Sequence, residues 1–476
     1  LLYVYQQSSS FKSFILPLLS TLLLWNIGTT WWIGNAHWIG AVSATLVNTA
    51  LMTAVFLIHF YARKKLPSRW SWLLFIALWI SMEFIMHRWD LLWPWLSLGN
   101  GFASLPFLIQ WYEYTGIFGG TLWVWVCNIM LLLAILNERK SIGKWVLPGI
   151  VLLLPIAFSW HLESKEIPFQ DQIKAGIIQP NFDPYTEKFE LHPQIQLHRF
   201  FELASRDEAD LIVGPETLYP SYLWEEGIGP HSIPGLNEYF TRFPNQSVLL
   251  GSTIFKAFNE IPKTTYNLRK LGSKRYYKAY NSALFFSFPN QTQLSHKGKL
   301  VPGAEAVPFA EYLGFLKNLS LDLGGTSGGL GLPDSLNVFQ GLHNERIASG
   351  ICYESVCGNF MADKVALGAN LIAVITNDAW WGNTAGHKQH LAYARLRAIE
   401  NRREIVRSAN TGISAHIDAR GNILKTIPYG ETGAIFVEAK LHENKTFYTK
   451  HGDIIGRLAL FLAVLFLLYA LAKPRP

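Results

Sequence analysis

Six long apolar stretches dominate the sequence, five of them before residue 161 and one close to its C-terminal end. Each approaches the ~20 residues with which an α-helix crosses the ~30 Å hydrocarbon core of a bilayer. Charged residues make up only 16% of the chain, against roughly 25% in a typical soluble protein. We therefore predict six membrane-spanning helices, at about 13–34, 40–62, 70–87, 116–137, 145–161 and 454–473.

The first third of the chain has too few charged residues to form the surface of a soluble protein. It holds only four of the 34 Asp and Glu residues but 15 of the 18 Trp residues. Buried helices of a soluble protein would need a polar outer layer, which these residues cannot supply. The composition excludes a disordered chain and a single soluble globule. A transporter is an alternative, but charges in the spans are sparse, Glu83 being the main one, and no ion-pathway pattern emerges.

Basic residues lie between the apolar stretches in a consistent pattern. They occur at Lys12, in the loops 63–69 and 139–144, and at Lys473 and Arg475. Cytoplasmic loops of membrane proteins are enriched in Lys and Arg, so we place all of these positions in the cytoplasm. The resulting threading of the spans puts residues 162–453 on the outer face of the membrane.

The segment 88–115 differs from the stretches around it, because it is rich in Trp, Pro and Gly and carries several charges. These charges and helix breakers weigh against a seventh span. Aromatic side chains favour the headgroup region of a bilayer, so the segment is predicted to be an interfacial structure on the outer face.

The chain changes character at about residue 165, where most of its charge begins. Short runs rich in β-branched and aromatic residues, typical of buried strands, alternate from there with helical pieces. The segment 386–405 is the clearest helix, and the alternation predicts a layered α/β domain. We divide the chain into helices over 1–164, a domain over 165–450 and a final helix over 451–476. The expected strands lie in 175–181, 209–217, 247–255, 280–288, 346–355, 371–380, 405–417 and 434–441.

Several ligand classes find no support in the sequence. The net charge is +7, but no basic helix with interleaved stacking aromatics indicates nucleic acid. The Gly-rich stretch 322–333 lacks the Lys of a phosphate-binding loop. The three Cys residues form no CxxC motif and no cluster with His, so neither a metal site nor a disulfide scaffold is predicted.

Three residues near predicted strand ends can carry chemistry: Glu216, Lys297 and Cys352. A cysteine is a strong nucleophile for acyl transfer, and its thioester stays reactive. A carboxylate can take the thiol proton if burial raises its pKa towards neutrality. A Lys ammonium can stabilise the oxyanion of the tetrahedral intermediate. The set is chemically complete without His or metal.

Each of these residues also has a plain structural explanation. A single Cys at a strand end is more often part of the core, a Glu after Pro is usually a solvated turn residue, and Lys297 with Lys299 is typical of a surface hairpin. Cys357 competes with Cys352 for the role of nucleophile. Because Cys357 lies away from the strand end, we interpret it as structural.

The sequence around these residues resembles the nitrilase superfamily and, within it, the membrane-embedded apolipoprotein N-acyltransferase family. Nitrilase motifs are shared with soluble amidases, whereas their insertion between membrane spans is specific to this family. The resemblance extends over nearly the whole chain. The matching motifs are GPE at 214–216, KxKLVPxxE at 297–305, GICYE at 350–354 and TNDAWWG at 376–382, followed by 389–403 and 407–412 in the expected order.

The resemblance implies an αββα sandwich on the outer face of the membrane and a role for each matched residue. Glu216 would be the general base, Lys297 the oxyanion stabiliser and Cys352 the nucleophile. Three residues would support them and three would bind substrate: Glu305, Tyr353 and Glu354 in the first group, and Trp380, Phe189 and Asn377 in the second.

The sequence departs from the family at three places. Gly303 and Ala304 stand where Phe-Gly is frequent, and Phe189 aligns where Trp is frequent. The family usually has about eight spans, and the abrupt start of the chain at Leu1 is consistent with two helices missing upstream.

The function implied by the resemblance is the last step of bacterial lipoprotein maturation, in the bacterial cytoplasmic (inner) membrane. A phospholipid would donate an acyl chain to Cys352, and the N-terminal diacylglyceryl-cysteine of an apolipoprotein would accept it. No cofactor, metal or nucleic acid is expected, and the enzyme is expected to be a monomer. The stretch 322–333 is predicted to be a lid that keeps water from the thioester.

Two further alternatives remain at this point. One is a membrane-anchored amidase or nitrilase that hydrolyses a small C–N substrate, and turnover of such a substrate without lipid would identify it. The other is an inactive scaffold or lipid-binding protein. The presence of Glu216, Lys297 and Cys352 together argues against an inactive protein.

Overall fold

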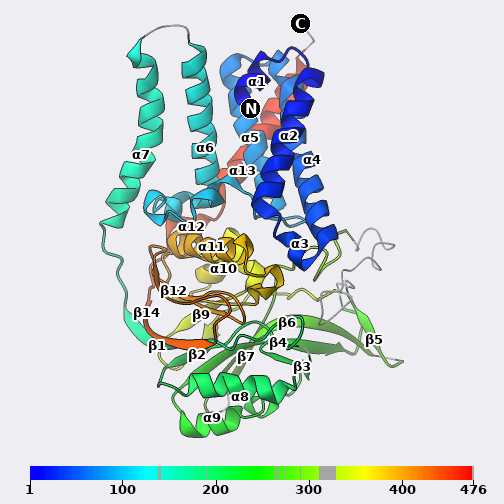
Figure 1. Cartoon of the computed structure of the whole chain (residues 1–476), viewed down its shortest axis with the longest axis vertical. Coiled ribbons are helices and arrows are strands. Elements are labelled where there is room, and N and C mark those ends of the chain that lie inside the picture. The colour runs from blue at the N-terminus through cyan, green and yellow to red at the C-terminus, as the bar shows by residue number, and fades with distance from the viewer. Residues whose placement is uncertain are drawn as a thin grey trace. The chain divides into compact units, whose positions relative to one another are not determined.

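The computed structural model describes residues 1–473 apart from 138–140, 189, 263, 264, 266, 274, 290 and 310–328. The chain divides into two compact units, which are described here in turn (Figure 1). One comprises Leu1–Glu166 with His451–Pro476, and the other comprises Ile167–Lys450.

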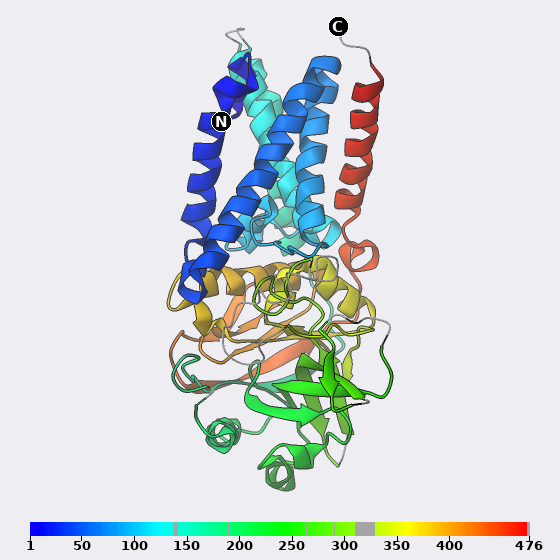
Figure 2. The ribbon, with the colours of Figure 1, turned by 90° about the vertical axis from the view of Figure 1, so that its right-hand side faces the viewer.

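The first unit consists of helices. Among the described residues, six helical segments are long and apolar enough to cross a membrane, in agreement with the six predicted spans. Figures 1 and 2 show these helices running alongside one another. The helices of this unit are α1 Leu2–Gln7, α2 Phe11–Thr30, α3 Ile33–Ala36, α4 Trp38–Ala62, α5 Ser68–Met86, α6 Tyr112–Leu136, α7 Val146–Glu163 and α13 Ile454–Ala472.

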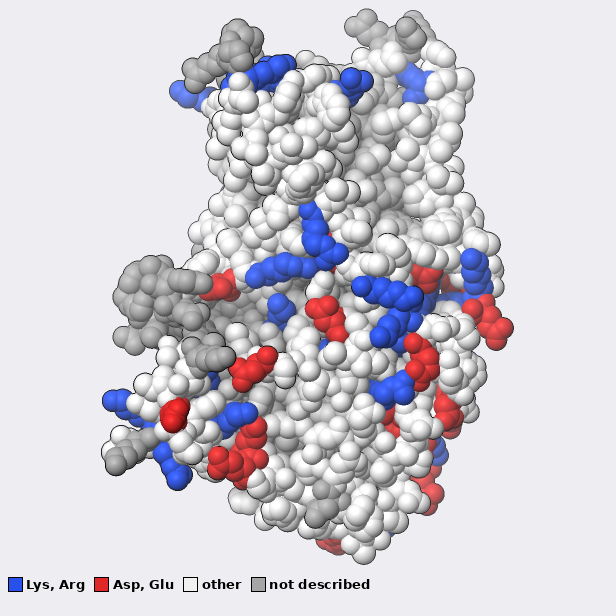
Figure 3. Space-filling model, turned by 180° about the vertical axis from the view of Figure 1, so that it is seen from behind, with Lys and Arg blue, Asp and Glu red and all other residues white. Residues whose placement is uncertain are grey.

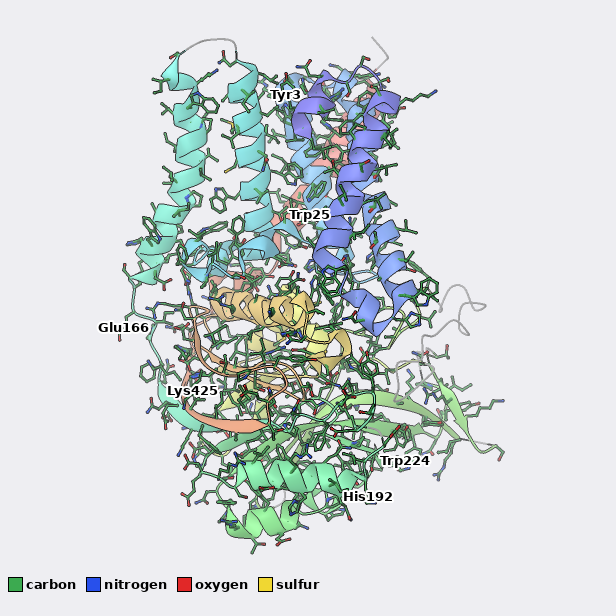
Figure 4. The ribbon with its side chains drawn as sticks, in the orientation of Figure 1. Tyr3, Trp25, Glu166, His192, Trp224 and Lys425 are labelled. Carbon is green, nitrogen blue, oxygen red and sulfur yellow. The ribbon has the colours of Figure 1, made fainter. Side chains whose placement is uncertain are left out.

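Large apolar side chains cover the outside of this helical unit. On α2, Leu16 is 72% exposed, Leu24 is 71% exposed and Trp25 is 44% exposed (Trp25 is labelled in Figure 4). In the view of Figure 3 the surface along the helices is almost uncharged, and Lys and Arg lie towards the ends of them. Such a surface is stable against lipid chains and not against water. The chain is therefore a multi-pass membrane protein.

Helix α5 is the most buried of the six and packs against α4, α6 and α13. Its contact with α13 depends on Gly456, where a Cβ atom would lie 2.2 Å from Cδ2 of Phe84. Small residues of this kind let helix backbones approach closely in membranes. The buried Glu83 carboxylate accepts hydrogen bonds from Trp79 Nε1, the Leu98 amide and the Thr121 hydroxyl. Its polar atoms are thus satisfied inside the bundle.

The segment between α5 and α6 contains short 3₁₀ turns at Leu98–Phe102 and Pro106–Leu108. It is fastened to α6 by two hydrogen bonds of Gly99, whose amide donates to Thr121 Oγ1 at 3.1 Å and whose carbonyl accepts from Tyr112 Oη at 2.8 Å. These bonds satisfy buried backbone groups that no regular helix would satisfy.

The second unit contains two β-sheets. Within the described residues, the first sheet has eight strands in the order β14-β1-β2-β4-β6-β5, with β3 beside β4 and β7 beside β6. Strands β1, β2 and β4 are parallel, and β6 returns antiparallel to β4. The strands are β1 Asp171–Gln179, β2 Leu211–Val213, β3 Tyr219–Trp224, β4 Ser247–Phe258, β5 Arg269–Leu271, β6 Arg275–Ser287, β7 Gln291–His296 and β14 Gly433–Leu441.

The second sheet has six strands among the described residues, in the order β13-β12-β11-β10-β9-β8. Its centre is parallel, because β10 runs parallel to both β9 and β11. The strands are β8 Phe339–Gln340, β9 Arg346–Ile351, β10 Leu371–Thr376, β11 Ile405–Ala409, β12 Ser414–Ile417 and β13 Ile423–Ile427.

The two sheets pack face to face through a shared apolar core. Ile177 and Leu249 of the first sheet and Ile351 and Ile375 of the second belong to one cluster of fully buried side chains. Helices α8 and α9 cover the outer face of the first sheet, and α10 and α11 cover that of the second (Figure 1). This confirms the αββα sandwich. The helices of this unit are α8 Pro193–Ala204, α9 Leu236–Arg242, α10 Gly358–Ala366 and α11 Ala385–Asn401, and α12 Phe447–His451 follows them.

Two predicted elements differ from the observed ones at their ends. The stretch 405–417, expected as one strand, is two antiparallel strands, β11 and β12. The helix expected over 386–405 ends at Asn401, because Arg402 adopts a left-handed conformation with φ 49°. A residue in that conformation stops a helix and lets β11 begin at Ile405.

Because Gly251 of β4 has no side chain, the backbone after β2 passes unusually close to β4 at this position. A Cβ atom at this position would lie 2.4 Å from the Thr217 amide nitrogen and 2.7 Å from Cα of Glu216. Because both neighbours are backbone atoms, a side chain at residue 251 requires the Glu216 segment to move.

Gly251→Ala should therefore displace the Glu216 backbone and lower the free energy of unfolding by ~1–3 kcal/mol. Thermal unfolding of the purified protein measures this. Gly101→Ala is the control, since nothing lies within 4 Å of a Cβ atom there. Equal melting temperatures for the two variants would contradict the expected steric conflict.

Candidate active site

Three predicted catalytic residues stand just beyond strand ends in the sandwich. Glu216 follows β2, Lys297 follows β7 and Cys352 follows β9. The backbone after β2 is held by β4, where the Gly251 amide donates to the Pro215 carbonyl at 3.0 Å. The Lys297 amide donates to the Asn281 carbonyl of β6 at 2.8 Å. The ends of rigid strands thus position all three side chains.

Lys297 lies between two carboxylates. Its Nζ is 3.0 Å from Glu216 Oε1 and 2.7 Å from Glu305 Oε1. The Glu305 side chain is fixed in turn, because its Oε2 accepts from the Val301 amide at 2.9 Å. Lys297 is only 1% exposed, so its charge acts in a medium of low dielectric and is screened little.

Asn281 of β6 completes this charged cluster and was not predicted from the sequence. Its Nδ2 donates to Glu216 Oε1 at 2.7 Å and to Glu305 Oε1 at 3.3 Å. The signal available in the sequence was one side-chain amide within the mostly apolar run 280–288. That signal gives no indication of which partners the side chain meets.

Cys352 occupies a strained position at the end of β9. Its φ is 50°, a left-handed conformation that residues with a Cβ seldom adopt. The strain is held by hydrogen bonds to its carbonyl, which accepts from Ser355 Oγ at 2.7 Å and contacts His390 Nε2 at 3.2 Å. Strain of this kind is typical of residues that the surrounding structure aims at a reaction centre.

Electrostatics link Cys352 to the charged cluster. Burial, followed by the negative charge of Glu216, raises the pKa of the Cys352 thiol well above its ordinary value, while Lys297 opposes this. The resting side chain is therefore a neutral thiol. The pKa of Lys297 is raised although burial alone would lower it, because Glu216 and Glu305 both lie beside it. Lys297 is consequently a permanent cation.

Burial alone does not set the pKa of Glu216. Burial acts to raise this pKa, but the charges of Lys297 and Lys188 and the hydrogen bond from Asn281 outweigh burial and hold the pKa below its ordinary value. Glu216 is thus ionised at neutral pH. It is available to accept a proton, but proton transfer from the free thiol is uphill.

Glu354 joins the Cys352 turn to the Lys297 strand end. Its carboxylate accepts from the Gly298 amide at 2.5 Å and from the Ile351 amide at 2.7 Å. Its countercharge is Lys364, whose Nζ lies 3.5 Å away, and both side chains are fully buried. Glu354 therefore fixes the spacing between the nucleophile and the cation.

A second buried network lies behind Cys352. The Asp378 carboxylate pairs with Arg407 at 2.6 Å and with His390 at 2.9 Å, and it accepts from the Thr376 hydroxyl at 2.8 Å. The Thr376 hydroxyl also contacts the Cys352 thiol. Sequence analysis missed this network, because its members come from two strands, a helix and a turn.

The remaining predicted residues lie as follows. Tyr353 is buried, and burial raises the pKa of its hydroxyl. Trp380 is partly exposed and its ring meets that of Tyr185 edge-on at 5.4 Å. Asn377 is buried, and its Oδ1 accepts from Asn410 Nδ2 at 3.2 Å. Phe189 lies outside the described residues.

The structure describes the competing cysteine and part of the predicted lid. Cys357 is buried at the start of α10, and neither it nor Cys352 forms a disulfide. Of the predicted lid 322–333, residues 322–328 lie outside the described residues. No group of three His, Cys, Asp or Glu side chains within the described part of the chain could hold a metal ion.

This arrangement fits acyl transfer through a thiol. A protonated thiol, an ionised carboxylate and a buried ammonium stand together on a rigid αββα sandwich. The model of the carbon-nitrogen hydrolase family matches residues 174–446, the whole span that carries these groups. The fold and the site thus define the carbon–nitrogen hydrolase class.

The comparisons also cover the helical unit. Residues 1–130 match the model of the apolipoprotein N-acyltransferase N-terminal domain. An apolipoprotein N-acyltransferase of Geobacter metallireducens is 30% identical over 80% of this chain and 71% of its own length. Another from Chlorobaculum tepidum is 27% identical over 96% and 87%. The chain belongs to the apolipoprotein N-acyltransferase family and is an enzyme of lipoprotein N-acylation.

Solved structures that the comparison finds similar to part of this chain include Saccharomyces cerevisiae Nit3, a member of branch 10 of the nitrilase superfamily. The similarity covers 60% of this chain and 95% of that one, with 15% identity and a TM-score of 0.39.

Glu354→Gln should lower the free energy of unfolding by ~3 kcal/mol, because it leaves the buried Lys364 ammonium without its countercharge. Thermal unfolding of the purified variant measures the loss. The double variant Glu354→Gln/Lys364→Met removes both charges and should recover part of it. A double variant less stable than the single one would show that the ion pair is not the cause.

Proposed function

We propose that this enzyme transfers an acyl chain from a membrane phospholipid to the N-terminal diacylglyceryl-cysteine of an apolipoprotein, through a thioester on Cys352. The observation that carries the proposal is the Lys297 ammonium, which two carboxylates hold at 3.0 and 2.7 Å and whose charge, with that of Glu216, acts on the Cys352 thiol. In this proposal Glu216 is the general base and Lys297 stabilises the oxyanion, and Glu305 holds Lys297 in place.

The first half-reaction forms the thioester. The sulfur of Cys352 attacks the ester carbonyl of the phospholipid while its proton moves to the Glu216 carboxylate. Because transfer from the free thiol is uphill, the proton leaves as the S–C bond forms, and Lys297 stabilises the oxyanion that develops. The tetrahedral intermediate then breaks the ester C–O bond. Glu216 returns the proton to the alkoxide of the departing lysophospholipid.

The second half-reaction forms the amide. The neutral α-amine of the diacylglyceryl-cysteine attacks the thioester carbonyl, and Glu216 accepts a proton from its nitrogen. Lys297 again stabilises the oxyanion. The C–S bond breaks, and the Cys352 sulfur takes the proton back from Glu216. A ping-pong sequence follows, since the lysophospholipid leaves before the apolipoprotein reacts.

The proposal extends to the location of the enzyme and to substrate binding. We place the enzyme in the bacterial cytoplasmic (inner) membrane as a monomer, with residues 167–450 on the outer face. The basic loop 63–69 supports this orientation, because cytoplasmic loops are enriched in Lys and Arg. Trp380, Asn377 and Phe189 are proposed to contact the acyl donor.

The nucleophile can be identified by mass spectrometry of the purified enzyme after incubation with phospholipid. The wild-type enzyme should gain one acyl group on the peptide that contains Cys352. Cys352→Ala and Cys352→Ser should not be acylated, because the first lacks a nucleophile and the second offers a much weaker one. Cys357→Ala is the matched control and should be acylated normally. An acyl group on Cys357 would refute the assignment.

The pH dependence of acyl-enzyme formation follows from the lowered pKa of Glu216. The base is active when ionised, so the rate falls only when the pH drops through this pKa. The acid limb should therefore lie below the ordinary glutamate value of 4.5, and the rate should stay level between pH 7 and pH 5. Single-turnover acylation, quenched with acid and followed by mass spectrometry, measures the profile.

Asn281→Ala provides the matched comparison for this profile. It removes one hydrogen bond to the Glu216 carboxylate and should move the acid limb to higher pH. A wild-type limb near pH 6 to 7 would contradict the lowered pKa.

A further inference from the structure

Lys188 is a second buried ammonium at the active site, and the reaction above makes no use of it. It is 1% exposed, and its Nζ donates to the backbone carbonyl of Glu216 at 3.0 Å. Its own backbone is fixed at both polar atoms. The amide donates to the Asp183 carbonyl at 2.8 Å, and the carbonyl accepts from Gln196 Nε2 at 2.7 Å.

Burying an ammonium group costs desolvation free energy, and a protein that buries one usually places a negative charge near it. The charge nearest to Lys188 belongs to the cluster around Lys297. Glu216 and Glu305 contribute two negative charges there, and Lys297 contributes a single positive one. Without Lys188 this buried cluster would carry one uncompensated negative charge. With Lys188 protonated, the four charges sum to zero.

This balance matters when the thiol reacts. Moving the proton from Cys352 to Glu216 leaves a negative charge on sulfur, and later on the oxyanion, in place of the one on Glu216. The total charge of the cluster stays the same in every step. It stays at zero only if a second cation is present, and a net buried charge raises the free energy of each of these states.

Lys188 is close enough to act on both partners of the proton transfer. Its charge interacts with the Glu216 carboxylate and with the Cys352 sulfur. Burial lowers the pKa of Lys188 to about 8, and Glu216 and Cys352 oppose the effect. Lys188 is thus still mostly protonated at pH 7.

We propose that Lys188 is a positioning residue for the acyl transfer: it holds Glu216 by its backbone carbonyl and supplies the second positive charge that keeps the buried cluster neutral as the proton leaves Cys352. The proposal rests on the roles proposed above for Glu216 and Cys352. Lys188 keeps its own proton throughout, and it forms no bond to substrate.

The test uses the reactivity of the thiol, which a purely structural lysine would not change. Iodoacetamide alkylates the thiolate, so the rate at the Cys352 peptide, followed by mass spectrometry between pH 6 and 7.5, reports the thiolate fraction while Lys188 is still mostly protonated. Lys188→Met removes the charge and keeps the length of the side chain. It should shift this part of the profile upward by about one pH unit and slow alkylation at pH 7 about tenfold.

Acyl-enzyme formation from phospholipid should slow by less than this factor, because Lys188 also lowers the pKa of Glu216 and its removal makes that carboxylate a stronger base. Lys188→Arg retains the charge and should keep most of the wild-type rate in both assays. Lys278→Met is the matched control. Lys278 is also buried, at 3% exposure, and its Nζ lies 5.9 Å from the ring centroid of Phe258, so the profile of this variant should equal that of the wild type.

The proposal is overturned if folded Lys188→Met has the wild-type profile, or if Lys188→Arg is as slow as Lys188→Met. Melting temperatures identify the folded variants. If Lys188→Met does not fold, Lys188→Arg decides: a wild-type profile supports the role of the charge, and an upward shift contradicts it. If the wild-type enzyme gains no acyl group from phospholipid, the proposed function fails, whereas the alkylation comparison still decides the role of Lys188.

Discussion

The chemistry of this enzyme depends on one ammonium group shared by two carboxylates. Lys297 lies 3.0 Å from Glu216 and 2.7 Å from Glu305 in a nearly dry interior. That interaction keeps Lys297 protonated and Glu216 ionised, and the field of both charges acts on Cys352. Removing any of these charges from the protein interior would leave its partners buried and uncompensated, which costs several kcal/mol.

The packing of the sandwich fixes the positions of Glu216, Lys297 and Cys352 relative to one another. Glu216 and Lys297 follow strands of one sheet and Cys352 follows a strand of the other, so the shared apolar core between the sheets sets their separation. Glu354 then ties the nucleophile turn to the residue after Lys297. Gly251 leaves room for the Glu216 backbone. Packing over many residues thus fixes atoms to within a few tenths of an ångström, as charge stabilisation requires.

The membrane helices, the strands and a layered α/β domain could be predicted from the sequence, because hydrophobic length and alternation are local properties. The αββα arrangement was implied by the resemblance to the nitrilase superfamily. The motifs around Glu216, Lys297 and Cys352 likewise indicated which residues would meet. The ionisation of Glu216 could not be predicted, since it depends on cations 28 and 81 positions away along the chain. Asn281 and Lys188 were missed for the same reason: only the fold brings each to the carboxylates.

The protonated state of the Cys352 sulfur has a consequence for the durability of the enzyme. Peroxides, disulfides and soft metal ions react with thiolates and hardly with thiols. In the proposed mechanism Cys352 loses its proton only when its sulfur attacks the substrate carbonyl. Between turnovers it stays a thiol and reacts slowly with these reagents. The resting sulfur is therefore a poor target for such oxidants and metal ions.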